Sequence, residues 1–197
     1  MSRTLLVRPA AAHLAQYVAA LRTGWSPDNV RPEATAREQL AAIGADPARF
    51  LAGMEDRAAR AGPITLPDGS VVPRLPGFRR WIWDTAADAF CGSIGLRWQP
   101  GTAALPPWTL GHVGYAVVPW RRGQGHATRA LGLLLPEAAA LGLPWVELTT
   151  EPENAASVAV IAAHGGVLVE RFAKPAAYGG GEGLRFRIPL EGAGARP

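Results

Sequence analysis

The sequence contains almost no lysine and almost no cysteine. Lys174 is the one lysine among 20 basic residues, and Cys91 is the one cysteine in the 197-residue chain. A single thiol excludes an internal disulfide and a metal site built from several thiolates. Because disulfides belong to oxidising compartments, the shortage of cysteine favours a cytoplasmic location.

Long hydrophobic runs are also lacking. Hydrophobic residues make up 48% of the chain, but no run approaches the roughly 18 apolar residues of a membrane span. Residues 1–12 hold no apolar segment followed by a cleavage site, so we expect no signal peptide. The length predicts one domain over residues 1–197 with a full core. We expect no membrane partner.

The positive charge is modest and dispersed. The formal net charge is +4, and the arginines are scattered along the chain instead of gathering on one periodic face. Nucleic acid is therefore an unlikely partner. A basic surface would equally suit a small ligand with several phosphates.

Strand and helix patterns both occur along the chain, and we expect an α+β protein. We expect strands at 4–8, 78–84, 90–98, 109–118, 144–150, 167–173 and 184–190. Helices are expected at 10–21, 33–43, 47–61, 127–140 and 155–164, with a small hairpin at 64–72. The segment 25–76 reads as a helical and loop insertion.

The stretch after the strand at 109–118 is the most informative. Pro119 ends the strand because proline has no N–H to donate, and two arginines and two glycines follow before the helix. Such a turn directs backbone N–H groups into one concavity beside a helix N-terminus, which suits a pyrophosphate. Neither the P-loop nor the dinucleotide glycine pattern is complete here. A turn that merely joins strand and helix remains the other interpretation.

The strand that follows this helix should lie beside the strand that precedes it. A strand, crossover helix and second strand give parallel neighbours in most proteins. The sequence therefore predicts that the strands at 109–118 and 144–150 run parallel, with the glycine turn at their carboxyl end.

Two motifs resemble signatures of one enzyme family. The run from Arg122 to Ala127, Arg-Gly-Gln-Gly-His-Ala, resembles the Arg/Gln-x-x-Gly-x-Gly/Ala signature of the GNAT acetyltransferases. Asn154-x-x-Ser157, about 30 residues later, resembles the second GNAT signature. The resemblance covers residues 78–190 and extends to the first strand and helix. The run 73–81 resembles a bacterial subgroup of predicted acetyltransferases.

The resemblance implies the GNAT fold, a mixed central β-sheet flanked by helices with parallel splayed strands at the coenzyme site. It also implies transfer of acetyl from acetyl-coenzyme A to a primary amine of a small molecule or peptide, with no metal. A homodimer is left open. The coenzyme-binding residues implied are Val117, Val118, Arg122, Gly123, Gln124, Gly125, His126, Ala127, Thr128, Asn154 and Ser157. Asn154 has a helix N-cap as its structural alternative.

One position departs from the family. Many GNAT enzymes carry a tyrosine seven residues after the asparagine as the acid for the leaving thiolate, and Ile161 stands there. The alternative function is thus an acetyl-coenzyme A-binding regulatory module without efficient turnover.

The reaction also needs a route for protons. A lysine-like amine must lose a proton, which costs about 4–5 kcal/mol at pH 7. The catalytic candidates are His112, Tyr115 and Glu147, and a structural strand histidine is the alternative for His112. Trp81, Trp83, Trp98 and Trp108 either shape an acceptor pocket or belong to the core.

Overall fold

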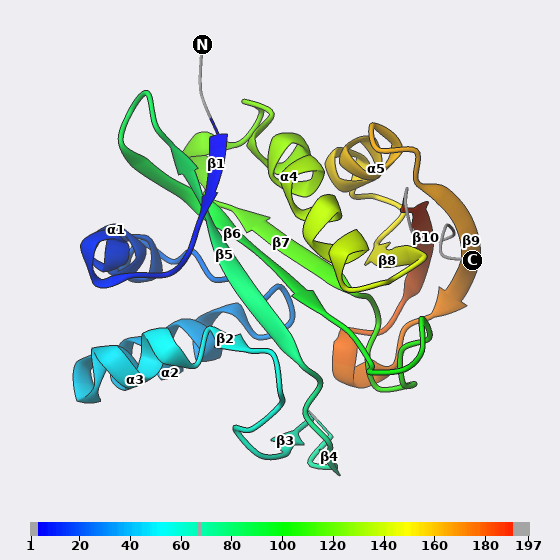
Figure 1. The fold of residues 1–197 in the computed structure, drawn as a ribbon, viewed down its shortest axis with the longest axis horizontal. Helices are drawn as coiled ribbons and strands as arrows, with labels where there is room; N and C mark the ends of the chain where they lie inside the picture. The colour runs from blue at the N-terminus through cyan, green and yellow to red at the C-terminus, as the bar shows by residue number, and fades with distance from the viewer. Residues whose placement is uncertain (1–3, 67, 191–197) are drawn as a thin grey trace.

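Long antiparallel strands cross the middle of the protein, as the computed structural model shows (Figure 1). It describes residues 4–66 and 68–190. The strand order is β1-β5-β6-β7, and a short strand, β2, pairs with the first residues of β5. These strands are β1 (Thr4–Val7), β2 (Glu55–Asp56), β5 (Gly77–Asp84), β6 (Ala89–Arg97) and β7 (Val113–Val117).

Two smaller sheets complete the strand content of the described residues. One has the order β8-β10-β9 and the other is the hairpin β3-β4. Their bounds are β3 (Ile64–Thr65), β4 (Val71–Val72), β8 (Trp145–Thr150), β9 (Val167–Ala173) and β10 (Glu182–Pro189). The pairing of β9 with β10 is antiparallel, so the strands predicted at 167–173 and 184–190 lie side by side.

The alternation of side chains along β5 separates two hydrophobic cores. Phe78 and Ile82 point into the core beneath α4 (His126–Ala140) and α5 (Ala155–Ala162). Trp81 and Trp83 point to the opposite face. Successive side chains of a strand face opposite sides of a sheet, so each face of the long sheet has its own helical cover.

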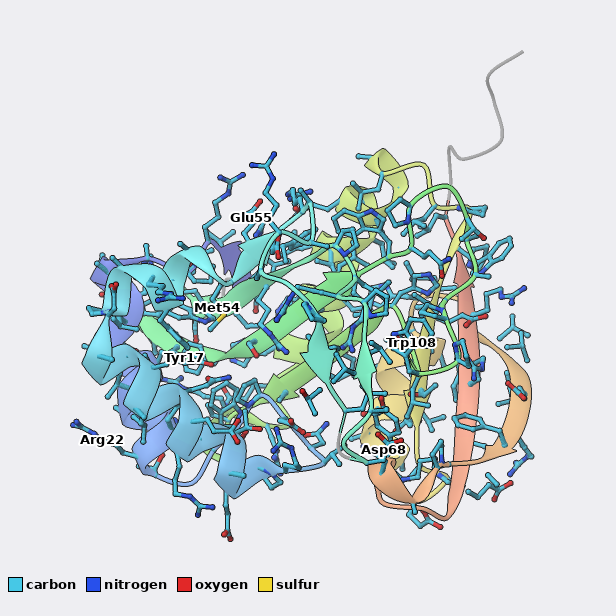
Figure 2. All side chains as sticks on the ribbon, turned by 90° about the horizontal axis from the view of Figure 1, so that it is seen from below. Tyr17, Arg22, Met54, Glu55, Asp68 and Trp108 are labelled. Carbon is cyan, nitrogen blue, oxygen red and sulfur yellow. The ribbon has the colours of Figure 1, made fainter. Side chains whose placement is uncertain are left out.

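The second core lies under the N-terminal helices α1 (Ala11–Arg22), α2 (Pro32–Ala45) and α3 (Pro47–Ala52). Tyr17 of α1 stacks on Trp81, with 4.7 Å between ring centroids. Figure 2 shows Tyr17 and Met54 where these helices meet the long strands. This stack fixes α1 against the sheet, and the Phe50 ring of α3 packs against Tyr17 in turn.

The two main sheets meet between β7 and β8. The His112 N–H donates to the Glu147 carbonyl over 2.7 Å, just before β7 and within β8. Within the described residues no strand ladder continues from this contact. The two strands therefore separate, and they leave the splayed opening that the resemblance implied.

Two predicted elements are shorter than expected. The helix predicted over 47–61 ends at Ala52, because Met54 turns into the core and the Asp56 carboxylate accepts the N–H groups of Arg60 and Ala61. The strand predicted from residue 109 begins at Val113. Just before it, the His112 carbonyl still accepts the Arg97 N–H of β6, while the His112 N–H donates to the Glu147 carbonyl of β8. The other predicted helices and long strands agree to within two residues.

No helix within residues 4–66 and 68–190 is both long and apolar enough to cross a membrane. The prediction of one domain over 1–197 stays a prediction, since its ends fall partly outside the described residues.

Candidate active site

The glycine turn between β7 and α4 leaves a row of backbone donors free. A 3-10 turn, η1 (Pro119–Arg121), leads into Gly123 and Gly125, whose φ angles of 73° and 74° are left-handed. Gly125 is the N-cap of α4. Among the described residues, no hydrogen bond uses the backbone N–H groups of 123–128. A helix N-terminus with free N–H groups is a site for an anion such as a phosphate.

The side chains of the turn anchor it from beneath. His126 is 1% exposed, its Nδ1 lies 3.0 Å from the Thr4 hydroxyl, and its Nε2 faces the Cys91 thiol. Burial lowers the pKa of His126. Arg129 donates from Nε to Thr4 and from Nη2 to the Gln124 carbonyl. The imidazole of His126 thus holds α4 on the sheet, and it is the backbone of the turn that faces outward.

Val117 and Val118 differ in what they offer a ligand. The Val118 N–H donates to the Cys91 carbonyl over 2.9 Å, and its side chain is fully buried. The Val117 carbonyl accepts from Arg122 Nε over 3.3 Å, so it points away from β6. Because backbone groups alternate in direction along a strand, Val117 presents the open edge of β7 and Val118 does not.

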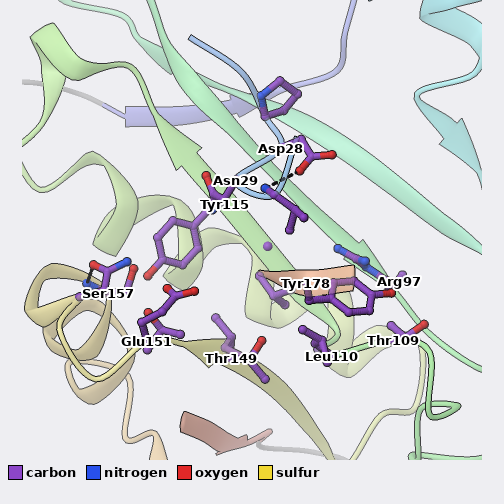
Figure 3. Close-up of a pocket in the computed structure, with 18 of the residues that line it drawn as sticks. Asp28, Asn29, Arg97, Thr109, Leu110, Tyr115, Thr149, Glu151, Ser157 and Tyr178 are labelled. Carbon is purple, nitrogen blue, oxygen red and sulfur yellow. Dashed lines mark hydrogen bonds between the residues drawn. The ribbon is translucent and has the colours of Figure 1, made fainter. Parts of the chain in front are cut away.

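A cavity of about 400 Å³ occupies the opening between β7 and β8 (Figure 3). The α1–α2 loop and the segment after β9 close its other sides. Its lining comprises 27–31, Thr35, Gln39, Arg79, Arg97, 109–111, 113–115, 148–151, Asn154, Ser157, Ile161, Lys174 and Tyr178.

Three of the predicted site residues meet in this cavity. The Tyr115 hydroxyl points toward Ser157 (Figure 3). Burial raises the pKa of Tyr115, and the nearby Ser157 side chain opposes this only in part. Asn154 caps α5, because its Oδ1 accepts the Ser157 N–H over 3.0 Å, which confirms the N-cap role. Ile161 forms part of the wall.

His112 lies outside the cavity lining. Its side chain is fully buried, and its Nδ1 accepts the Glu147 N–H over 3.0 Å. Burial lowers the pKa of His112 to about 4, although the Glu147 carboxylate and the Ala103 carbonyl act in the other direction. The lone pair on Nδ1 is therefore already in use.

Glu147 also lies outside the lining. Its carboxylate accepts from Arg187 Nη2 at 2.7 Å and from Arg185 Nη1 at 3.1 Å. Burial would raise the pKa of Glu147, but the two guanidinium groups outweigh it and lower the pKa. The structure thus brings Tyr115 to Asn154 and Ser157, and it places Glu147 in contacts between β8 and β10.

The sequence did not single out several of the cavity's polar residues. Arg79 and Arg97 come from β5 and β6, and Tyr178 comes from the 3-10 turn η2 (Ala176–Tyr178). The sequence did hold one sign for Arg79, because residues 79, 81 and 83 of a strand point to the same face, so Arg79 lies on the face of Trp81 and Trp83. Of the two alternatives for the tryptophans, the core holds for Trp81 and Trp83, and none of Trp81, Trp83, Trp98 and Trp108 lines the cavity.

Residues 4–66 and 68–190 contain no group of three or more His, Cys, Asp or Glu side chains arranged to hold a metal ion.

The family of the chain follows from a comparison with known proteins. Residues 3–167 match the family model of the acetyltransferase (GNAT) domain. No curated protein matches the sequence. Several solved structures are similar over nearly the whole chain, as described next.

Three of the similar structures are acetyltransferases by name. They include the microcin C7 self-immunity acetyltransferase in complex with acetyl-CoA and AMP (11% identity, 96% of this chain and 94% of that chain, TM-score 0.62). Ribosomal-protein-S5-alanine acetyltransferase from Vibrio fischeri is 18% identical (98% and 94%, TM-score 0.58). A spermidine N-acetyltransferase chimera from Vibrio cholerae and hSSAT is 12% identical (98% and 98%, TM-score 0.61). At these identities the likeness shows the fold, while the family model spans most of the sequence, and the chain therefore belongs to the GNAT family of N-acetyltransferase enzymes.

Proposed function

We propose that this protein transfers the acetyl group of acetyl-coenzyme A to a primary amine of a small molecule or peptide. The observation that carries the proposal is the row of free backbone N–H groups at 123–128, at the carboxyl end of a strand whose open edge faces the cavity. A pyrophosphate at the turn and a pantetheine arm along Val117 would bring the thioester toward Tyr115. A solved structure of the same fold is named as a complex with acetyl-CoA and AMP, which supports a coenzyme site in this fold.

In the proposed reaction the amine nitrogen bonds to the thioester carbon and the carbon–sulfur bond breaks. The amine must arrive neutral, and its proton leaves through water. The coenzyme leaves as a thiolate, whose conjugate acid has an ordinary pKa of about 8.5. We assign Tyr115 as the acid that protonates this sulfur. Because burial raises the pKa of Tyr115, the phenol stays protonated through the neutral range and can donate.

The base role predicted for His112 and Glu147 remains untested. A base needs a free lone pair within reach of the proton it removes. The Nδ1 of His112 accepts a backbone N–H, and the Glu147 carboxylate accepts from two arginines. We therefore propose that both are positioning residues that fix β8 beside β7, and that water removes the proton from the amine.

A second function, coenzyme binding without efficient turnover, has one observation in its favour. Ile161 stands in the cavity wall where many relatives carry their acid. The two functions differ in whether coenzyme A is released when amines are added.

Calorimetry with acetyl-coenzyme A, followed by a screen of amine pools for thiol release and mass spectrometry of the product, tests the proposal. Micromolar binding and an acetylated amine are expected. Binding without any product would favour the regulatory module, and the absence of binding at low salt would contradict both functions. A cytoplasmic location and a homodimer stay part of the proposal, and gel filtration of the same sample reports the second.

A further inference from the structure

Two arginines face the cavity without a charged partner. Arg79 and Arg97 both line it. Within residues 4–66 and 68–190, neither guanidinium takes part in an ion pair or a side-chain hydrogen bond. Arg80, by contrast, pairs with Glu55 and Glu137. Several other arginines of the described residues also form no ion pair, but Arg79 and Arg97 are the two of these that line the cavity where a substrate would bind.

The sheet is shaped to hold these two side chains. Gly95 on β6 pairs with Gly114 on β7, and both lie on the face that looks toward the N-terminal helices. A Cβ on Gly95 would stand 3.3 Å from Arg79 Cγ, and a Cβ on Gly114 would stand 3.4 Å from Arg97 Nη2. The two glycines thus give the arginines room to lie across the sheet.

The acidic residues of the cavity are already engaged. Glu151 forms an ion pair with Lys174 at 2.6 Å. The Asp28 carboxylate accepts the N–H groups of Val30 and Arg31 and the Thr35 hydroxyl. Asp28 raises the pKa of Arg97 through its charge at a distance, without an ion pair. The two guanidinium charges are therefore left for a ligand.

The electrostatic environment of Arg97 also favours an anionic ligand. Arg97 is exposed where it borders the open cavity, and desolvation by the protein around it, followed by the charge of Arg79, lowers its pKa. The group is still charged at pH 7, so two like charges share the cavity. An anion between them would relieve that repulsion.

We propose that the acceptor amine also carries an anionic group, a carboxylate or a phosphate, and that Arg79 and Arg97 bind it. This inference rests on the proposed function and names its substrate class. Arginine suits the task because its planar fork binds carboxylate and phosphate through paired hydrogen bonds. A polyamine would instead bring further positive charge to these two residues, and the site should disfavour it.

The experiment compares matched amines at constant ionic strength. β-Alanine is set against its amide, O-phosphoethanolamine against ethanolamine, and spermidine serves as the cationic amine. Release of the coenzyme A thiol is measured for each. We expect kcat/KM to be at least about tenfold higher for the anionic member of one pair, in line with charge-assisted hydrogen bonds. The pair that responds identifies the group as carboxylate or phosphate.

Arg79→Gln, Arg97→Gln and the double variant then test the residues. The double variant should abolish the preference for the anionic member while its affinity for acetyl-coenzyme A stays within about twofold. Arg22→Gln is the matched control, since Arg22 is an exposed residue at the end of α1 and does not line the cavity. It should keep both the preference and the rate.

The failures of the two proposals are distinguishable. Equal rates with both members of each pair, or a preference for spermidine, would overturn this inference and leave the acetyltransferase activity standing. Loss of coenzyme affinity in Arg97→Gln with unchanged selectivity would assign the arginines to the coenzyme and also overturn it. If no amine is acetylated, titration of inorganic phosphate and acetate against wild type and the double variant decides, because only the wild type should bind.

Discussion

The proposed donor site and the proposed acceptor site would recognise their ligands by different means. At the proposed donor site, the turn at 123–128 offers backbone N–H groups. At the proposed acceptor site, the cavity is formed by side chains from the α1–α2 loop, β5, β6 and the segment after β9. One site depends on the local path of the chain, and the other depends on how distant segments pack.

This difference decides which substitutions matter. A turn that binds through its backbone tolerates many side chains but needs glycine where φ is positive. A pocket that binds through side chains depends on their chemistry, and it can accommodate new substrates by changing single residues. We therefore expect glycine substitutions to weaken the donor site most and charge substitutions to weaken the acceptor site most.

The largest effect is expected from Gly125→Asp. The new carboxylate would stand beside the free N–H groups where the pyrophosphate belongs, so charge repulsion and loss of space act together. We expect the Kd for acetyl-coenzyme A to rise by about 10²-fold or more, equivalent to losing about 2.7 kcal/mol. Calorimetry on the folded variant measures it.

Gly142→Asp is the matched control for that substitution. Gly142 follows α4, has a φ of 80°, and a Cβ there would meet no atom within 4 Å. The two variants share the backbone strain of a left-handed aspartate, but only Gly125 is at the turn. A Cβ at Gly125 would also stand 2.9 Å from Arg129 Nη1, the far end of a side chain that can move aside. Equal coenzyme affinity in both folded variants would show that the turn is merely structural.

The same contrast explains what the sequence could predict. The order of elements and the glycine turn were predictable, because Pro119, the two glycines and the helix that follows act within a few residues. The role of Asn154 as an N-cap was predictable for the same reason. The family resemblance supplied the splayed strands at the junction, which no local pattern encodes.

The cavity could not be predicted because its parts are far apart in sequence. Asp28, Arg97 and Tyr178 meet only after the sheets and the N-terminal helices have packed. The base role of His112 stays a prediction, and the contact of its Nδ1 with the Glu147 N–H could not be found from the sequence because the two residues lie far apart in the chain. The helix predicted over 47–61 failed for a related reason, because the tertiary burial of Met54 ends it.

Tyr115→Phe tests whether chemistry resides at the acceptor end of β7. Removing the hydroxyl removes the proposed acid and little else, so turnover should fall by about 10²-fold, the usual contribution of a general acid. Coenzyme affinity should hardly change. Steady-state rates with a saturating donor measure the first and calorimetry the second. If the variant were fully active, Tyr115 would not be the acid, and water alone would supply the proton to the sulfur.

A smaller effect is expected from His112→Gln, and it concerns stability. The folded protein holds His112 neutral with a pKa of about 4, against 6.5 for the ordinary group. The unfolded chain therefore binds the extra proton first as pH falls, and stability is lost between pH 6.5 and about 4. The loss amounts to about 3 kcal/mol at most. Urea unfolding at pH 7.5 and 4.5 should show a smaller acid loss in the variant.

Turnover of the same variant separates this view from the base role. We expect the rate of His112→Gln to stay within about threefold of wild type from pH 6 to 9, since a general base contributes about 10² or more. A folded variant with a loss of that size at pH 7, recovered at high pH, would restore His112 to the mechanism.

The smallest effect is expected at Glu147. Gln in its place keeps the shape but weakens the contacts to Arg185 and Arg187, and Arg185 retains Glu170 at 2.8 Å. We expect a loss of about 1 kcal/mol in the free energy of unfolding at pH 7. Because the folded pKa of Glu147 is lowered, its contribution is present above the ordinary value and vanishes as pH falls through the folded value.

Glu170→Gln is the control for that variant. Glu170 contacts the same Arg185, but its side chain is 50% exposed, so its loss should be smaller still. Neither residue lines the cavity, and turnover should stay unchanged in both. A different outcome would be lower turnover in Glu147→Gln with a stability equal to that of Glu170→Gln. Glu147, on β8, would then take part in the reaction itself and would no longer be a positioning residue.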